Sequence, residues 1–315
     1  MTKFNLNFQK DIAPHLLAVV VFFLITFIFF KPMFLDNKSL NQHDILQWKG
    51  GAQELIDYRE ATGEEGLWSN NMFSGMPAYL VNTQFSGNLL IQVEKVYTLF
   101  LGSPAKILFA AFLSFYIMLL CFGVRPYLAI AGALLFGLST YNTIGFVAGH
   151  NARITAVAYI PLVLGGIHLA FQRKWVWGFV LTMIGLGLNL RVNHYQITYY
   201  LLLMVMIYGL IWLVFAIREK TMGPYFKTIA ILSVAVVIAV GCNIGRMWTI
   251  VEYSQYSIRG PGELTSGQEN VDADGLDKAY AFEFSNGIFE PLVVFIPNIM
   301  GGASNQKLDR DSNLG

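Results

Sequence analysis

Long runs of apolar residues alternate with short polar segments along most of this chain. A helix that crosses the hydrocarbon core of a membrane needs about 20 apolar residues. The runs that approach this length lie at 14–35, 104–123, 126–147, 153–171, 175–190, 196–217 and 227–249. The pattern therefore predicts an all-α polytopic membrane protein with about seven transmembrane helices. A further apolar patch at 288–300 contains two prolines, and we interpret it as a re-entrant segment or the start of another span.

The composition agrees with a membrane protein and excludes an ordinary water-soluble domain. Hydrophobic residues make up 55% of the 315 residues, and charged residues only 13%, whereas soluble domains carry about 25% charged residues. Cys121 and Cys242 both lie in apolar runs, so we infer neither a disulfide nor a metal site from them. The first apolar run is too long for the core of a signal peptide, and we expect it to remain as an anchor.

Basic residues mark one set of loops as cytoplasmic. With the N-terminus inside, the cytoplasmic segments contain Lys3, Lys10, Arg125, Arg173, Lys174, Arg218, Lys220 and Lys227. The predicted outer loop 36–103 holds eight acidic against four basic residues, and the loop 250–290 holds eight against two. We therefore divide the chain into a transmembrane domain at 1–249, which includes the loop 36–103, and a segment at 250–315, which holds an acidic outer loop and the start of a further membrane segment.

The loop 36–103 is a polar, aromatic-rich stretch in an otherwise apolar chain. After Asp44, apolar residues from Ile45 to Ile56 recur at helical spacing, which predicts a helix that lies along the membrane surface. Asp44 then has two interpretations that do not exclude one another, a helix N-cap and a catalytic base. Further on, Trp68 and the run Phe-Ser-Gly-Met-Pro at 73–77 predict a folded turn docked at the interface.

Polar residues collect at the predicted outer ends of the helices. Such groups are costly near a membrane unless they face protein or water, and they often mark function. The residues concerned are His43, Asp44, His150, Asn151, Arg153, Arg191, Asn193, His194, Gln196, Arg246 and Glu252. Because four separate helix ends supply them, we predict that they share one site.

The chemistry of this predicted site has several interpretations. His43, His150 and His194 match no zinc spacing, so we favour hydrogen-bonding residues over the alternative of metal ligands. Arg153 and Arg191 suit a phosphate group, with snorkelling to lipid headgroups as the alternative, which we favour for Arg246. The acidic run 272–277 has only part of the ligand spacing of a calcium loop, and we interpret it as part of a solvated loop.

Four short segments resemble one family. The segments Asn-Gln-His-Asp at 41–44, Phe-Ser-Gly-Met-Pro-Ala-Tyr at 73–79, Gly-His-Asn at 149–151 and Asn-His-Tyr-Gln at 193–196 resemble the YfhO family of bacterial membrane proteins. That family is similar to the GT-C superfamily of polyprenyl-phosphate-dependent glycosyltransferases. Members of the family usually have more spans than this chain, so we expect the chain to be the N-terminal part of a longer protein.

The resemblance implies a membrane glycosyltransferase that acts on the outer face of the bacterial cytoplasmic membrane. It implies a polyprenyl-phosphate-linked sugar as donor and an envelope glycan or lipid as acceptor. We also expect contact with membrane lipids, no nucleic-acid partner and no cofactor, with a divalent metal as the alternative that the spacing does not support. Asp44 would be the catalytic base, and the polar residues at the helix ends would bind the sugar or phosphate. A polytopic transporter or lipid flippase, and a non-enzymatic envelope scaffold, are the alternatives.

Overall fold

The structure is a computed structural model that describes residues 7–257, 278–283, 285, 287–294, 296 and 299. The chain divides into two compact units, Met1–Arg246 and Met247–Gly315. The run 272–277, interpreted above as a solvated acidic loop, lies outside the described residues, as does part of the apolar patch at 288–300. Within that patch the structure describes a short 3₁₀ helix, Glu290–Val294.

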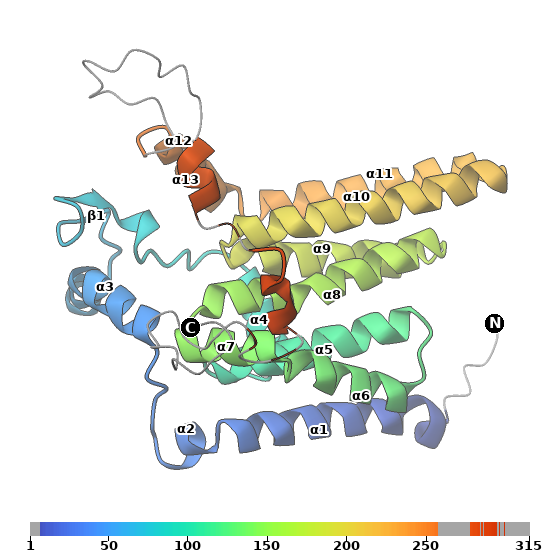
Figure 1. Ribbon diagram of the computed structural model, residues 1–315, viewed down its shortest axis with the longest axis horizontal. Coiled ribbons are helices and arrows are strands. Elements are labelled where there is room, and N and C mark those ends of the chain that lie inside the picture. The colour runs from blue at the N-terminus through green and yellow to red at the C-terminus, as the bar shows by residue number, and fades with distance from the viewer. Residues whose placement is uncertain are drawn as a thin grey trace. The chain divides into compact units, whose positions relative to one another are not determined.

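The first unit is built from helices (Figure 1). Its apolar helices are α1 (Ala13–Phe29), α5 (Ala105–Cys121), α6 (Pro126–Gly137), α7 (Thr140–Ala148), α8 (Asn151–Phe171), α9 (Trp175–Arg191), α10 (Tyr195–Arg218) and α11 (Met222–Gly241). Shorter elements are the π-helix η1 (Phe8–Ile12), α2 (Lys31–Leu35), the 3₁₀ helix η2 (Ala78–Leu80) and α4 (Leu90–Tyr97). Helix α12 (Ile244–Ser254) crosses the boundary between the units, and α13 (Lys278–Glu283) belongs to the second.

Several of these helices are apolar and long enough to cross a membrane. By length and composition, three helices among the described residues meet this requirement, namely α8, α10 and α11, or up to four if α6 and α7 form one span. Helices α1, α5 and α9 are apolar but have 17 residues each, or about 25 Å of helix. The all-α membrane class is therefore supported, and each predicted apolar run contains one or two helices.

The boundaries of three predicted spans differ from the pattern. The run 14–35 breaks at Phe30, between α1 and α2, and the run 227–249 ends its helix at Gly241. The run 126–147 forms two helices, α6 and α7, which are bent by 41° relative to one another. Hydrophobicity alone does not detect such breaks, because every residue around them remains apolar.

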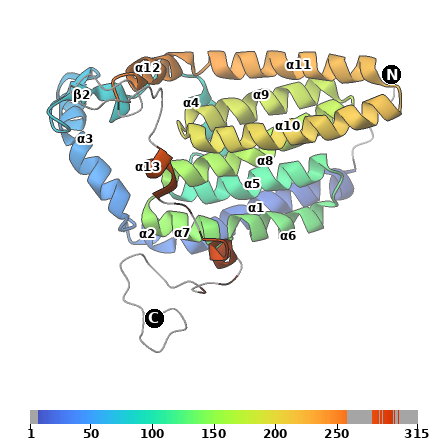
Figure 2. The same ribbon diagram turned by 45° about the horizontal axis from the view of Figure 1, so that its top comes forward.

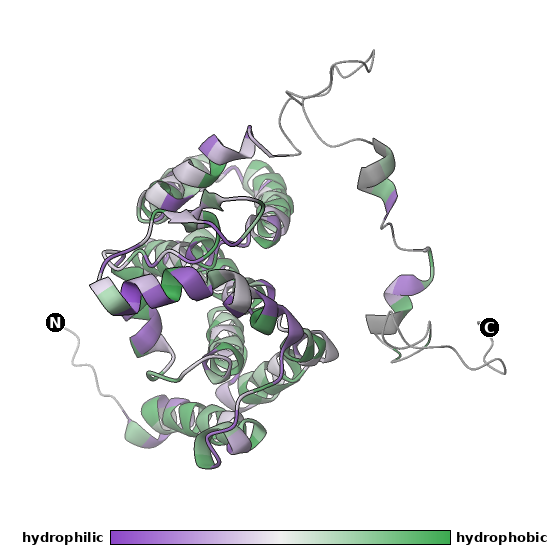
Figure 3. Ribbon diagram, turned by 90° about the vertical axis from the view of Figure 1, so that its left-hand side faces the viewer, coloured by the Kyte–Doolittle hydropathy of each residue, from purple (hydrophilic) through white to green (hydrophobic). Residues whose placement is uncertain are grey.

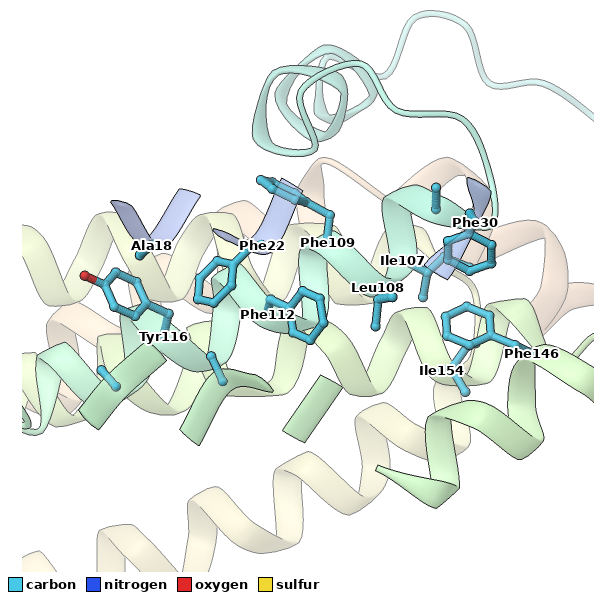
Figure 4. Packing of buried hydrophobic residues seen from close by; sticks show 13 residues of the cluster. Ala18, Phe22, Phe30, Ile107, Leu108, Phe109, Phe112, Tyr116, Phe146 and Ile154 are labelled. Atoms are coloured by element: carbon cyan, nitrogen blue, oxygen red, sulfur yellow. The ribbon is translucent and has the colours of Figure 1, made fainter. Parts of the chain in front are cut away.

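Aromatic side chains fill the core between α1 and α5 (Figure 4). Phe22 of α1 stacks on Phe112 of α5, with ring centroids 5.4 Å apart, and packs edge-on against Tyr116. Helix α6 presents Ala129, Ala133 and Gly137 to the same core, and all three are buried. Small residues at every fourth position let α6 approach the aromatic side chains of this core closely.

Helices α8 and α9 approach one another through glycines. A Cβ atom placed on Gly178 of α9 would lie 2.5 Å from the backbone nitrogen of Ala170 in α8. A Cβ atom on Gly166 of α8 would lie 2.6 Å from the backbone nitrogen of Thr182. Because backbone atoms cannot move aside as a side chain does, these glycines fix the distance between the two helices.

Helix α3 (His43–Thr62) lies across one end of the helices, where α8 and α10 begin and α9 ends (Figures 1 and 2). Its polar residues contrast with the apolar helices behind it when this end is viewed (Figure 3). Ala52 and Leu55 are buried while Lys49, Gln53 and Asp57 are exposed, so the predicted amphipathic helix is present. The loops at the opposite end contain the basic residues Arg125, Arg173, Lys174, Arg218 and Lys220.

The predicted turn around Gly75 is also present. Strands β1 (Trp68–Ser69) and β2 (Met76–Pro77) form a small antiparallel hairpin, in which Trp68 pairs with Pro77. Gly75 has φ +117°, and a Cβ atom there would lie 2.7 Å from Nε1 of Trp68. Glycine is required at this position for both its backbone conformation and its lack of a side chain.

The close approach of α8 and α9 gives a test of the fold. Gly178→Ala should lower the free energy of unfolding by about 1–3 kcal/mol, because the new methyl group overlaps the backbone of α8. Gly209→Ala in α10 is the matched control, since a Cβ atom there meets nothing within 4 Å, and it should raise stability by about 0.5–1 kcal/mol. Thermal unfolding of both purified variants in detergent compares them, and equal midpoints would contradict the packing described here.

Candidate functional site

Gln42 fastens the start of α3 to the start of α8. The residue is buried, with 5% of its surface exposed. Its Nε2 donates to the carbonyl oxygen of Phe146 at 2.6 Å and to Oδ1 of Asn151 at 3.1 Å. Nδ2 of Asn151 in turn donates to Oε1 of Gln42 at 3.2 Å. We call this pair of residues the Gln42 clamp. Buried amides need such partners, so the clamp holds the two helix starts in one relative position.

Gly149 lets the turn between α7 and α8 lie against α3. It has φ +88°. A Cβ atom on it would lie 3.1 Å from Cβ of Gln42 and 3.3 Å from Cβ of Asp44. The run Gly-His-Asn at 149–151 therefore serves three purposes: close approach by Gly149, a site side chain from His150, and half of the clamp from Asn151.

The clamp places Asp44 beside His150. Oδ2 of Asp44 lies 3.1 Å from Nε2 of His150, and the two side chains are 48% and 41% exposed. Asp44 is not the N-cap that the sequence suggested, because α3 begins at His43 with Gln42 at the N-cap position. It lies instead in the first turn, where a carboxylate interacts favourably with the helix dipole. Its oxygens are thus left for His150 and for a ligand.

Most of the residues predicted to share a site line one cavity of about 880 Å³, which we call the Asp44 cavity. The predicted residues that line it are Asp44, His150, Asn151, Arg153, His194 and Gln196. Trp48 and Lys49 of α3, together with Ser103 and Pro104, add to its wall. Residues from separate helix ends therefore line one cavity.

Arg153 and His194 provide a cation and a neutral imidazole at this cavity. Nε of Arg153 is buried without a hydrogen-bond partner among the described residues, and its guanidinium lies over the ring of Tyr141, 5.3 Å from the centroid. Burial lowers the pKa of His194, and the charges of Arg153 and His150 lower it further against the opposing effect of a backbone hydrogen bond. His194 is therefore mainly neutral at pH 7 and is able both to donate and to accept a hydrogen bond.

Five of the residues predicted to share one site lie elsewhere, and two of them, Arg246 and Glu252, belong to α12. His43 is exposed, and its Nε2 lies 2.9 Å from Nε2 of Gln47 one turn along α3. Asn193 follows α9 in a left-handed conformation with φ +65°, and does not line the Asp44 cavity. Arg191 lines a different cavity of about 1160 Å³, which we call the Glu94 cavity. Sequence spacing placed His43, Asn193 and Arg191 near this end of the helices but did not resolve which way each side chain points.

Glu94 is the residue that the sequence analysis missed. It is 4% exposed and lies in α4, directly before the first helix of the second predicted span. Its carboxylate forms ion pairs with Arg191 and with Lys106, the latter at 2.9 Å, and accepts a hydrogen bond from the hydroxyl of Tyr159 at 2.9 Å. A lone acid among the apolar residues of 90–97 was the only sign of it in the sequence.

The charges around Glu94 determine its protonation. Burial by itself raises the pKa of this carboxyl, but the charges of Arg191 and Lys106 and the hydrogen bonds from Lys106 and Tyr159 outweigh burial, so the pKa lies below its ordinary value. Glu94 is therefore a carboxylate at neutral pH, and Arg191 is engaged with it. The interpretation of Arg191 as a phosphate ligand stays a prediction, and the structure adds that Arg191 is paired with Glu94.

The described residues contain no group of three or more His, Cys, Asp or Glu side chains that could hold a metal ion. Comparison of the chain with models of protein families, with curated proteins and with solved structures finds no match.

Removal of the Glu94 carboxylate should destabilise the protein. Glu94→Gln leaves Arg191 partly buried without its counter-charge, and breaking one side of a buried ion pair costs about 3–5 kcal/mol. Glu60→Gln is a suitable control, because Glu60 is exposed on α3 and the change should alter stability by less than about 0.5 kcal/mol. Chemical unfolding of the two variants measures the difference, and similar stabilities would show that the network is dispensable.

The same network predicts a dependence of stability on pH. Because the pKa of Glu94 is lowered by folding, its contribution is fully present above the unfolded-state pKa of about 4.3 and is lost as the pH falls through the lower folded-state pKa. The difference in free energy of unfolding between the wild type and Glu94→Gln should be constant from about pH 5 to 7 and should narrow below about pH 4. A difference that widens with acid would contradict this sign.

Proposed function

We propose that this chain is the membrane part of a GT-C-type glycosyltransferase of the YfhO kind, which moves a sugar from a polyprenyl-phosphate carrier to a cell-envelope acceptor. The observation that carries the proposal is the Asp44 cavity. It combines a half-exposed carboxylate, an imidazole 3.1 Å from it and an arginine, and it lies where apolar helices end. A lipid-linked substrate with a polar head needs these features together, since its tail stays in the membrane while its head reacts at the surface.

In this proposal Asp44 is the general base. Its carboxylate accepts the proton of an acceptor hydroxyl, whose oxygen attacks the anomeric carbon of the sugar, and the bond to the carrier phosphate breaks with its electron pair leaving on the phosphate oxygen. His150 holds the carboxylate in one orientation through the contact at 3.1 Å. His194 and Gln196 line the same cavity and bind sugar hydroxyls.

Arg153 is the better candidate for the leaving phosphate. It lines the Asp44 cavity, and its Nε has no hydrogen-bond partner among the described residues. Arg191 lines the other cavity and is paired with Glu94. A guanidinium that is not already neutralised stabilises developing negative charge more strongly, so the proposal assigns the phosphate to Arg153.

The proposal also fixes an orientation. The loops rich in Lys and Arg lie at the end of the helices opposite α3, and such loops stay in the cytoplasm. The Asp44 cavity would then face outward, with the N-terminus inside and the seven apolar runs crossing the membrane. The short helices α1, α5 and α9 would be accommodated by the polar residues at their ends, which reach the interface.

Replacement of the Asp44 carboxylate by an amide tests its role as the general base. Asp44→Asn should lower transfer at least about 100-fold, because the amide cannot accept the proton. Membranes that contain the variant are supplied with radiolabelled polyprenyl-phosphate hexoses, and incorporation of label into envelope material is measured. The free energy of unfolding of Asp44→Asn should remain within about 0.5 kcal/mol of the wild-type value, because the side chain is half exposed.

Asp57→Asn is the matched control for Asp44→Asn. Asp57 lies on the same helix and is exposed, and its one side-chain hydrogen bond within the described part of the chain is to Gln53, so its variant should transfer at the wild-type rate. Full transfer by Asp44→Asn would remove Asp44 from the role of base, and equal losses in both variants would point to a general effect on α3.

A further inference from the structure

A small cavity lies between two turns at the end of the helices opposite α3. The turn 172–174 joins α8 to α9, and the turn 219–221 joins α10 to α11 (Figure 1). We call this space the Glu219 cavity, and its volume is about 210 Å³. Among the described residues it shares no lining residue with the Asp44 cavity or the Glu94 cavity. A ligand bound here would therefore be separate from the proposed transfer site.

Hydrogen bonds between helices hold the walls of the Glu219 cavity in place. Nε1 of Trp175 in α9 donates to Oγ1 of Thr228 in α11 at 3.1 Å. The same Thr228 hydroxyl donates to the backbone oxygen of Ala170 in α8 at 3.3 Å. The hydroxyl of Tyr225 in α11 donates to the backbone oxygen of Gly209 in α10 at 3.4 Å. All four helices are thus joined around the cavity, so it is formed before a ligand enters.

Aromatic side chains make up much of this wall. Phe171 of α8 stacks on Trp212 of α10, with ring centroids 5.1 Å apart and planes 2° from parallel. Tyr225 lies beside Phe171 with centroids 5.8 Å apart, and Phe215 completes the group. Aromatic rings contact hydrocarbon favourably, and their faces also attract an ammonium group.

Two opposite charges line the cavity without neutralising one another. They are Arg173 of the first turn and Glu219 of the second, and both are exposed. Within the described part of the chain, neither forms an ion pair with the other or with a third residue. Exposed bases surround them in the same turns, namely Lys174, Arg218 and Lys220. A ligand that carries both a negative and a positive group would satisfy both charges of the wall.

We propose that the Glu219 cavity binds the headgroup of a zwitterionic phospholipid with a primary ammonium group, that is, a phosphatidylethanolamine. The guanidinium of Arg173 donates to the phosphate oxygens, an interaction for which arginine is well shaped. The ammonium group donates to the carboxylate of Glu219 and lies against the aromatic wall. The volume of about 210 Å³ accommodates such a headgroup but not the acyl chains.

The acyl chains have an apolar surface beside the cavity. Phe215 lines the cavity and is 47% exposed, and Ile211 lies one turn earlier on α10 and is 49% exposed. Residues four positions apart lie on one face of a helix. That face leads from the cavity along a helix long and apolar enough to cross a membrane, so the chains would remain in the hydrocarbon while the headgroup occupies the cavity.

Glu219 decides between this headgroup and those of other phospholipids. A phosphatidylglycerol headgroup has no cation for the carboxylate, which would repel its phosphate. The methylated ammonium of phosphatidylcholine has no N–H to donate to the carboxylate, and it is larger. The basic turns by themselves would favour anionic lipids, so preference for phosphatidylethanolamine is a specific consequence of the acid. The inference does not depend on Asp44 or on sugar transfer.

Titration of the purified full chain with single lipids tests the site. Phosphatidylethanolamine, phosphatidylglycerol and phosphatidylcholine with identical acyl chains are added to the chain in detergent, and the bound lipid is counted by native mass spectrometry. The wild type should bind phosphatidylethanolamine most tightly. Glu219→Gln should weaken this binding on the order of tenfold and should remove the preference, because a charge-assisted hydrogen bond is lost. Arg173→Gln should weaken binding of all three lipids, since all three carry the phosphate.

Arg125→Gln is the matched control for Arg173→Gln. Arg125 is an exposed base in the turn between α5 and α6 at the same end, and it does not line the Glu219 cavity, so its variant should bind the lipids as the wild type does. Both cavity residues are exposed, so their variants should keep the wild-type unfolding midpoint. Tighter binding of phosphatidylglycerol or phosphatidylcholine by the wild type, a preference that survives in Glu219→Gln, or equal losses in Arg173→Gln and Arg125→Gln would each overturn the proposal.

Discussion

The buried carboxylate of Glu94 is the constraint on which the arrangement of this end of the protein depends. Its partners come from α9, from α5 and from α8, so a single acid joins three apolar helices to α4. A buried charge is costly without partners, and a partner removed from such a group leaves the others unsatisfied. The network therefore holds these helix ends in one relative placement. The same helix ends line the neighbouring cavities, so their placement shapes those cavities.

The first loop is anchored twice, which explains how a polar segment of this length holds a defined position. Glu94 fixes its end, and the Gln42 clamp fixes its start against α8. Between these anchors the loop supports itself: Arg59 binds Glu65 through two hydrogen bonds and also the backbone oxygen of Asn82. Since both ends of the loop are attached to the helix bundle, the anchors keep Asp44 beside His150.

The sequence predicted the helices well because hydrophobic length is a property of each segment by itself. It also placed most of the site residues together, because alternating helices bring every second helix end to the same side. Sequence reasoning failed where the outcome depends on the direction of a side chain or on partners that are distant in the sequence. Of the two interpretations of Asp44, the helix cap is wrong, because Gln42 occupies that position. Glu94 gave no strong pattern, since its meaning comes from Arg191, Lys106 and Tyr159, which lie 97, 12 and 65 residues away.

Glu94 and Asp44 are acids of the same loop, and their surroundings give them different capacities. The oxygens of Glu94 accept from a lysine, an arginine and a tyrosine hydroxyl, and the side chain is 6% exposed. Asp44 has one imidazole partner and is 48% exposed on the wall of a cavity. A general base needs an oxygen that a substrate can reach. Of the two acids, Asp44 has fewer partners and the larger exposed fraction, so it meets that requirement better.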